Sequence, residues 1–308
     1  MKVKTAEISR SVNRVGSGWS QNRRLEFIDF RLRWDGQINR GDLTEHFGIS
    51  VPQASLDMAR YLQLAPANLE YDRSSRAYVV TEAFKPLFPT SDTQQYLSDL
   101  LFRANGGMGV AGSLLGWLPP FAAVPTPARR LEGDLLAAIL RAIRNQYALS
   151  VQYQSMSRPA PTTRILTPTA IAHDGFRWHV RAFCHTRKGF RDFVIARILK
   201  INQVAEAGAR PEDDAAWHNM LQLVLAPHPE LPLGVRRAIE YDYGMAKGRV
   251  TFECREALFF YVLRHLNLMP KQDKRPEAQQ IVLCNADALK RYIAKVAVSQ
   301  EDTGIQLP

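Results

Sequence analysis

The sequence predicts a multidomain α+β protein: an N-terminal winged helix-turn-helix, a central SH3/Sm-like β-barrel and a small C-terminal α/β domain. Its 308 residues are enough for two or three domains, and 46% hydrophobic residues are enough for real cores. Three helical patterns and two short strands open the chain, and short strands dominate residues 134–207. That second segment holds 11 Lys and Arg against 4 Asp and Glu, within a chain of net charge +10.

The first helix is predicted over residues 20–34. Leu25, Ile28 and Leu32 recur at helical spacing, and Ser20 is a suitable N-cap. The preceding twenty residues are polar and contain Gly and Ser, so we expect a flexible or ligand-ordered arm there.

Two further helices and a hairpin follow. Asn39 and Gly48 bound a short helix, Ser50 caps the next one, and Pro52 sits in its first turn, where no N–H is needed. The inward stripe of this third helix is expected to comprise Ala54, Met58, Tyr61 and Leu62. Strands are expected over 68–72 and 77–81, and this order of elements is typical of a winged helix-turn-helix.

The third helix is the expected reader of a DNA major groove, with Gln53, Ser55 and Asp57 predicted to be exposed. Glutamine can bond adenine in bidentate fashion, and arginines at a hairpin tip suit phosphate or minor-groove contacts. The candidate DNA-binding residues are Ser50, Pro52, Gln53, Ser55, Arg60, Arg73, Ser74 and Arg76. Residues 1–90 carry 13 Lys and Arg against 10 Asp and Glu, so one copy should bind weakly and a dimer is expected.

Residues 91–133 read as a connector. Ser91 can cap a helix that runs to Phe102, and a proline-rich stretch indicates a hinge or linker. Gly107, Gly109 and Gly112 match G-x-G-x-x-G, but they follow a helical pattern rather than a strand, so a dinucleotide site is rejected. A helix is then predicted over 131–146.

The strands of residues 134–207 place polar side chains on shared faces. Tyr153 and Ser155 have the same parity, as do His179 and Arg181, whereas Trp178, Val180 and Ala182 are expected inside the barrel. Arg197 is in phase with Phe193 and Ile195. Guanidinium groups beside hydroxyls and an imidazole make a phosphate receptor, so this face is the predicted anion site.

Residues 208–308 predict a small α/β domain with balanced charge. Strands are expected at MLQLVLAP, GRVTFEC and QQIVLCN, and helices over 234–243, 256–268 and 286–298. The segment is rich in aromatic residues, which suits a protein–protein role. The predicted domains are therefore 1–90, 91–133, 134–207 and 208–308.

Several classes of protein are not supported. Cys184, Cys254 and Cys284 form neither a disulfide framework nor a metal pair, so we expect free thiols in a reducing cytosol, with no metal and no cofactor. The first residues lack the apolar core of a signal peptide, and no run of 18 apolar residues predicts a membrane span.

Three stretches resemble a known family, the WYL-domain transcriptional regulators of the BrxR/CapW group, which is linked to bacterial phage-defence loci. Phe47–Val79 is similar to the recognition helix and wing of that group. Val151–Cys184 with Arg191–Ile198 resembles the WYL domain, and LVLAPHPELP with RRAIEYDYGM resembles the C-terminal domain. The name-giving triplet is here Trp178-His179-Val180, with histidine in the place of tyrosine.

The resemblance implies a homodimeric, cytoplasmic, nucleoid-associated repressor of a phage-defence operon. Its N-terminal domains would bind double-stranded DNA at a palindromic operator, and its C-terminal domain would assist dimerisation. The WYL domain would bind a nucleotide or oligonucleotide. Carried over by position, the ligand-binding residues are Tyr153, Ser155, His179, Arg181 and Arg197, followed by Arg158, Arg164 and Arg191.

Two other functions stay open from the residues. A single-stranded nucleic-acid-binding module without operator specificity would use the arginines with Phe176 and Trp178 for stacking. A nucleic-acid-processing enzyme would use His179, Arg181 and Tyr153 as acid–base groups. The scarcity of acidic residues in 134–207 argues against the enzyme, and no catalytic activity is expected.

Overall fold

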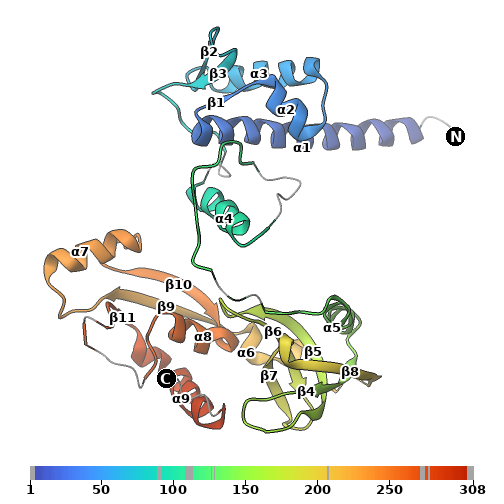
Figure 1. The fold of residues 1–308 in the computed structure, drawn as a ribbon, viewed down its shortest axis with the longest axis vertical. Coiled ribbons are helices and arrows are strands. Elements are labelled where there is room, and N and C mark those ends of the chain that lie inside the picture. Colours follow the sequence, from blue (N-terminus) through green and yellow to red (C-terminus); the bar gives the residue numbers. More distant parts are fainter. Residues whose placement is uncertain are drawn as a thin grey trace. The chain divides into compact units, whose positions relative to one another are not determined.

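The computed structural model describes residues 4–88, 92–107, 114–125, 127, 129–206, 208–270, 275–276 and 278–303. The chain forms two compact units, Met1–Pro127 and Ala128–Pro308, which are taken in turn (Figure 1). Within the described part of the chain, no helix has the length and apolarity needed to cross a membrane.

The first helix is much longer than predicted. Helix α1 spans Lys4–Asp35, so residues 4–19 are helical rather than an arm, and Ser20 lies inside the helix instead of capping it. The segment contains no proline, and each interior glycine weakens a helix by only about 1 kcal/mol, which a long helix tolerates. The predicted end is confirmed, since Gly36 follows with a left-handed φ of 74°.

The second helix begins and ends as predicted, and the third helix begins as predicted. Helix α2 spans Arg40–Phe47, with a reciprocal capping box between Asn39 and Asp42 and a left-handed Gly48 at its end. Helix α3 spans Val51–Leu64, and the Ser50 side chain accepts from the backbone N–H of Gln53. Such caps satisfy helix-end N–H groups that have no partner inside the helix.

The inward stripe of α3 is corrected at two positions. Ala54, Met58 and Tyr61 are buried, but Leu62 is 41% exposed, and Asp57, predicted to be exposed, is fully buried. Asp57 pairs with Arg24 of α1, a partner that the spacing within α3 does not reveal.

The wing is a three-stranded antiparallel sheet. Strands β2 (Leu69–Asp72) and β3 (Ala77–Val80) form the predicted hairpin. A short strand that was not predicted, β1 (Gln37–Ile38), pairs with β3, so the order is β1-β3-β2.

The connector contains one described helix, α4 (Thr93–Ala104), whose N-cap is Asp92. The predicted cap Ser91 lies outside the described residues, as do Gly109 and Gly112. Leu114 and Leu115 of the connector pack in the cores formed with α1, so this part of the connector is attached to the winged helix.

The second unit begins with helix α5 (Gly133–Asn145) and a five-stranded antiparallel sheet. Its strands are β4 (Ala148–Tyr153), β5 (Thr162–His173), β6 (Trp178–Cys184), β7 (Gly189–Val194) and β8 (Ile198–Ala205). Their order is β7-β6-β5-β4-β8, and among the described residues no pairing joins β7 to β8. The predicted closed barrel is therefore wrong. The 3₁₀ turn Ile195–Arg197 leads the chain from β7 into β8, the two edge strands of this sheet.

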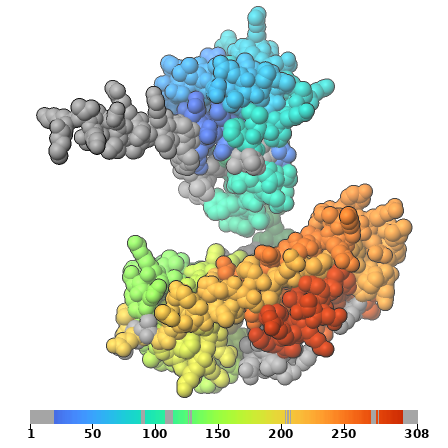
Figure 2. Space-filling view, turned by 180° about the vertical axis from the view of Figure 1, so that it is seen from behind, coloured from blue at the N-terminus to red at the C-terminus, as the bar shows by residue number. Residues whose placement is uncertain are grey.

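In the C-terminal part, helices and strands alternate along the chain. It contains α6 (Ala215–His218), β9 (Met220–Pro227), α7 (Leu233–Asp242), β10 (Val250–Arg255), α8 (Phe259–His265), β11 (Ile281–Leu283) and α9 (Ala286–Thr303). Strands β10 and β11 flank β9 in an antiparallel sheet. Helices α8 and α9 share one core with this sheet, built around Phe259, Leu263 and Tyr292. Figure 2 shows the second unit as one continuous surface from its green and yellow residues to its orange and red ones.

Candidate nucleic-acid interface and anion site

The predicted DNA-binding residues of α3 cluster at its N-terminal end. Ser50 and Pro52 are exposed, whereas Gln53 and Ser55 are half-buried. The Ser55 hydroxyl donates to the carbonyl of Val51 at 3.0 Å, so its proton is already used inside the helix. The amide of Gln53 is thus the main directional hydrogen-bonding group in the first turn.

The wing tip, the turn between β2 and β3, is exposed, and the carboxylate of Asp72 fixes its backbone. Arg73, Ser74 and Arg76 are all exposed. Asp72 accepts from the backbone N–H groups of Ser74 and Ser75 at 2.8 and 3.1 Å. Hydrogen bonds from Ser75 and from these N–H groups hold the pKa of Asp72 below its usual value. Arg60, further along α3, is exposed and donates to Gln63.

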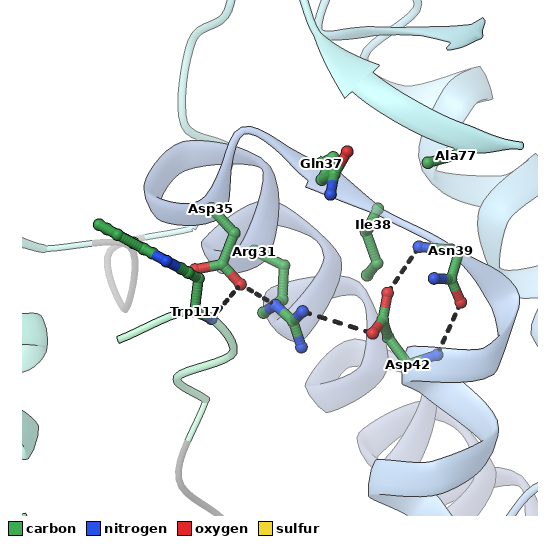
Figure 3. Close-up of a pocket in the computed structure, with 8 residues that line it drawn as sticks. All are labelled: Arg31, Asp35, Gln37, Ile38, Asn39, Asp42, Ala77 and Trp117. Carbon is green, nitrogen blue, oxygen red and sulfur yellow. Dashed lines mark hydrogen bonds and ion pairs between the residues drawn. The ribbon is translucent and has the colours of Figure 1, made fainter. Parts of the chain in front are cut away.

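A polar hollow of about 370 Å³ lies in the same unit, where α1 ends (Figure 3). Arg31 pairs with Asp35 and, at 3.4 Å, with Asp42. The backbone N–H of Trp117 donates to Asp35 at 3.2 Å, so the connector is fastened to α1 by the same network. Burial raises the pKa of Asp35, and the Arg31 charge and the Trp117 hydrogen bond only partly offset that rise. The residues of the hollow hold one another, which indicates a structural role.

In the second unit, the predicted ligand residue Arg181 is buried and already paired. Its Nε and Nη2 atoms bind the two carboxylate oxygens of Asp214 at 2.7 and 3.0 Å, and its Nη1 atom binds Asp192 at 3.2 Å. Only 7% of Arg181 is exposed. Two carboxylates satisfy this guanidinium, so it is unsuited to receive an anion.

His179 is buried on the same face. Its Nε2 atom donates to Asp174 at 2.9 Å, and its ring lies 5.1 Å from that of Tyr261 on α8. His265 of α8 donates to the carbonyl of Asp174. Burial raises the pKa of Asp174, but hydrogen bonds from His179 and from two backbone N–H groups outweigh this and bring it below its usual value.

The predicted open face of β6 is therefore an interior contact. Val180 and Ala182 are buried as expected, but His179 and Arg181 are buried too. Asp214 precedes α6, and Tyr261 on α8 donates to Asp192 at 3.1 Å, so elements of the C-terminal part cover this face. Trp178, predicted inside, is 48% exposed.

The other predicted ligand residues differ in their surroundings. Tyr153 is in the core against Phe193. Ser155 is half-buried near Ser157, and Arg158 and Arg191 are exposed. Arg164 is half-buried, and its Nε atom has no hydrogen-bond partner among the described residues. Arg197, half-buried in the 3₁₀ turn, belongs to a different group.

Four arginines, Arg129, Arg177, Arg197 and Arg264, form the arginine cluster: the charges of the other three act on Arg177, and only Arg197 of the four was predicted. Burial lowers the pKa of Arg177, and the charges of the other three lower it further, partly offset by Asp174. Among the described residues, no ion pair joins any of the four to a carboxylate. The Nε atom of Arg177 is buried without a partner. Arg129 and Arg264 are too far from β6 in the chain for strand parity to reveal them.

Two exposed aromatic residues flank Arg177. Phe176 is 64% exposed and Trp178 is 48% exposed. Phe176 stacks on His265 with ring centroids 5.6 Å apart, and the ring centroids of His173 and Trp178 lie 4.7 Å apart. Aromatic faces beside guanidinium groups are the combination that binds bases and phosphates together.

Comparison with known families matches three segments of the chain. Residues 20–101 match the "BrxR transcriptional regulator winged helix-turn-helix domain". Residues 134–203 match the "WYL domain", and residues 220–289 match the "BrxR transcriptional regulator, C-terminal dimerization domain". The matches follow the order of the elements described above.

Full-length relatives are also similar. The "DNA-binding transcriptional repressor CapW" of Pseudomonas aeruginosa is 51% identical over 92% of this chain and 95% of its own length. Its namesake in Escherichia coli (strain KTE188) is 50% identical over 90% of this chain and 93% of its own. The Stenotrophomonas maltophilia namesake is 45% identical over 89% of this chain and 93% of its own.

Proposed function

The chain belongs to the family of DNA-binding transcriptional repressors named CapW, and we propose from this premise that it is itself an operator-binding repressor. The supporting observation is the winged helix: α2, a left-handed Gly48 turn, and α3 with an exposed N-terminal end. Such a helix enters the major groove through its first turns. Identities near 50% over nine-tenths of the chain support the same role.

In this proposal, two groups of residues in the winged helix contact different parts of the DNA. Ser50, Pro52, Gln53 and Ser55 face base edges or the adjoining backbone, and Arg60, Arg73, Ser74 and Arg76 contact phosphates. Phosphate contacts set the orientation and base contacts set the sequence. The match of residues 220–289 to a dimerisation domain supports a homodimer, and a dimer requires a palindromic operator. The resemblance to phage-defence regulators suggests a defence operon as the regulated locus.

The test is a gel shift on the DNA upstream of the protein's own gene, followed by selection from random duplexes. We expect a palindromic site and a shift that survives moderate salt. Arg73→Gln with Arg76→Gln should weaken binding to all duplexes about equally, because phosphate contacts carry little sequence information. Absence of any sequence preference would contradict the proposal.

We further propose that the WYL part binds an anionic, nucleic-acid-derived ligand at the arginine cluster. The cluster replaces the predicted site around His179 and Arg181, since those residues are buried and paired. Among the described residues the guanidinium groups of the cluster form no ion pair with a carboxylate, and such groups favour phosphate oxygens. Phe176 and Trp178 supply faces for a base, so a nucleotide or a short single strand fits better than inorganic phosphate.

The C-terminal part contributes directly to this site. Arg264 lies on α8, which also carries Tyr261 and His265, and both of these contact the β6 region. A ligand that draws Arg264 toward Arg177 and Arg197 would therefore act on the dimerisation domain. A coupling of about 1–3 kcal/mol is enough to change DNA occupancy severalfold or more.

The ligand proposal is tested by adding short oligonucleotides and cyclic nucleotides to the protein–operator complex. We expect one class to change the operator affinity of the wild type but not that of the Arg177→Gln/Arg197→Gln variant. Strong single-strand binding without any duplex preference would instead favour the alternative, a single-strand-binding module without operator specificity.

A further inference from the structure

A buried ion pair lies directly beneath the recognition helix. Arg24 of α1 places its Nε and Nη2 atoms 2.6 and 3.3 Å from the two carboxylate oxygens of Asp57 on α3. Asp57 is fully buried, and the Arg24 side chain is 12% exposed. A paired carboxylate at this depth is held firmly, because a buried charge without its partner is strongly unfavourable.

Gln53 is the residue that joins this pair to the surface. It precedes Asp57 by one helical turn, and its Nε2 atom donates to the Asp57 carboxylate at 3.2 Å. A carboxylate only accepts hydrogen bonds, so it must face the amide nitrogen of Gln53 and not the amide oxygen. The pair thereby selects one of the two orientations of this amide.

We propose that Asp57, held by Arg24, positions the amide of Gln53 to read adenine in the major groove. With one N–H directed at Asp57, the amide oxygen and the second N–H remain for a ligand. Adenine offers the matching N6 donor and N7 acceptor side by side. Gln53 is then the specificity-determining residue, Asp57 and Arg24 are positioning residues, and the inference rests on the proposed binding of operator DNA.

The side chains next to Gln53 are also suited to contact an A·T base pair. Val51 and Leu56 are 57% and 63% exposed on the same helix, and Pro52 is exposed between Val51 and Gln53. Apolar side chains in a major groove contact thymine methyl groups. Ser55 donates its proton to Val51, so it does not compete with Gln53 as a donor.

The experiment uses the full chain and begins with selection of the preferred duplex by the wild type. All four base pairs are then compared at each half-site position by competition. We expect Gln53→Ala to lose about tenfold to a hundredfold of the preference for A·T at one position of each half-site. The preferences at other positions should stay within about twofold.

Asp57→Asn tests the positioning role, because an amide at residue 57 can face either end of the Gln53 amide. We expect the A·T preference to relax at the same single position, with the remaining preferences kept. If Asp57→Asn does not fold, Arg24→Met with Asp57→Leu removes both charges together, a change that buried pairs often tolerate. This double variant should show the same single-position loss.

Two matched controls are available in the chain. On α4, Gln95 donates to Asp99 at 3.1 Å with the same four-residue spacing, so Asp99→Asn makes the same change in an exposed pair away from α3. Gln63→Ala removes an exposed glutamine near the other end of α3. Both controls should keep every base preference.

The outcomes separate this inference from the proposed function. If Gln53→Ala keeps the wild-type preference at every position, Gln53 is not the reader. If Gln53→Ala loses it but both the Asp57→Asn and the double variant keep it, the positioning role is wrong. A wild type that selects no duplex at all would overturn the proposed function and this inference with it.

Discussion

Arg177 and Arg181 lie four residues apart in the chain but have opposite surroundings. Arg181 is buried, and three of its nitrogen atoms bind the carboxylates of Asp214 and Asp192. Arg177 is half-buried beside Arg129, Arg197 and Arg264, and its Nε atom has no partner among the described residues. The first arrangement stabilises the fold. The second lowers the pKa of Arg177 and leaves it without an ion pair among the described residues.

This difference shows why a local excess of positive charge does not by itself locate an anion site. Both arginines contribute equally to the charge count of residues 134–207. What separates them is the position of carboxylates brought in by other elements, above all Asp214 ahead of α6.

The largest effect is expected for Arg181→Met. The change leaves Asp214 and Asp192 buried without their cation, so the free energy of unfolding should fall by about 3–5 kcal/mol. Arg177→Met should leave stability unchanged or raise it slightly, because it removes a charge that other cations repel. Denaturant unfolding of both variants checks this contrast. Equal losses would show that the two arginines do not differ as described.

A smaller effect is expected for His179→Leu. The Asp174 carboxylate would lose the hydrogen bond from Nε2 and stay largely buried, which should lower the free energy of unfolding by about 1–3 kcal/mol. His173→Leu, on an exposed residue beside Trp178, is the control and should change stability little. If both changes have the same effect, His179 is not a structural partner of Asp174.

The smallest expected effect is on the pH dependence of the free energy of unfolding. Because the pKa of Asp174 is depressed in the folded state, its contribution to stability is complete above the ordinary Asp pKa of about 3.9. The contribution is lost as the pH falls through the lower, folded pKa. Asp174→Asn should therefore show a shallower acid loss of stability than the wild type. Unfolding curves measured between pH 5 and about pH 2 test this, and identical slopes would contradict it.

The winged helix was predictable because its signals are local. The signals at Asn39, Gly48, Ser50 and Pro52 act on backbone groups a few residues away, so both ends of α2 and the start of α3 followed from sequence. Asp57 is the exception there, since its burial depends on Arg24, 33 residues earlier.

The central sheet was predictable only in part. Its strands were recognised, but parity could not reveal that both faces of β6 are covered, because the covering residues Asp214 and Tyr261 come from the next segment of the chain. The same limit hid Arg129 and Arg264 from the predicted site. Closure of the barrel was also expected, but among the described residues no strand pairing joins the edge strands β7 and β8.

The most direct test of the proposed ligand site is the affinity of the protein and its arginine variants for an anionic oligonucleotide. Binding of a fluorescein-labelled single-stranded oligodeoxynucleotide is measured by anisotropy for the wild type, Arg177→Gln/Arg197→Gln and Arg187→Gln. Arg187 is an exposed arginine beyond the other end of β6, so its variant is the control for loss of charge. We predict at least about tenfold weaker binding for the cluster variant and less than about threefold for the control. Equal affinities for the two variants would contradict the assignment of the arginine cluster as the ligand site.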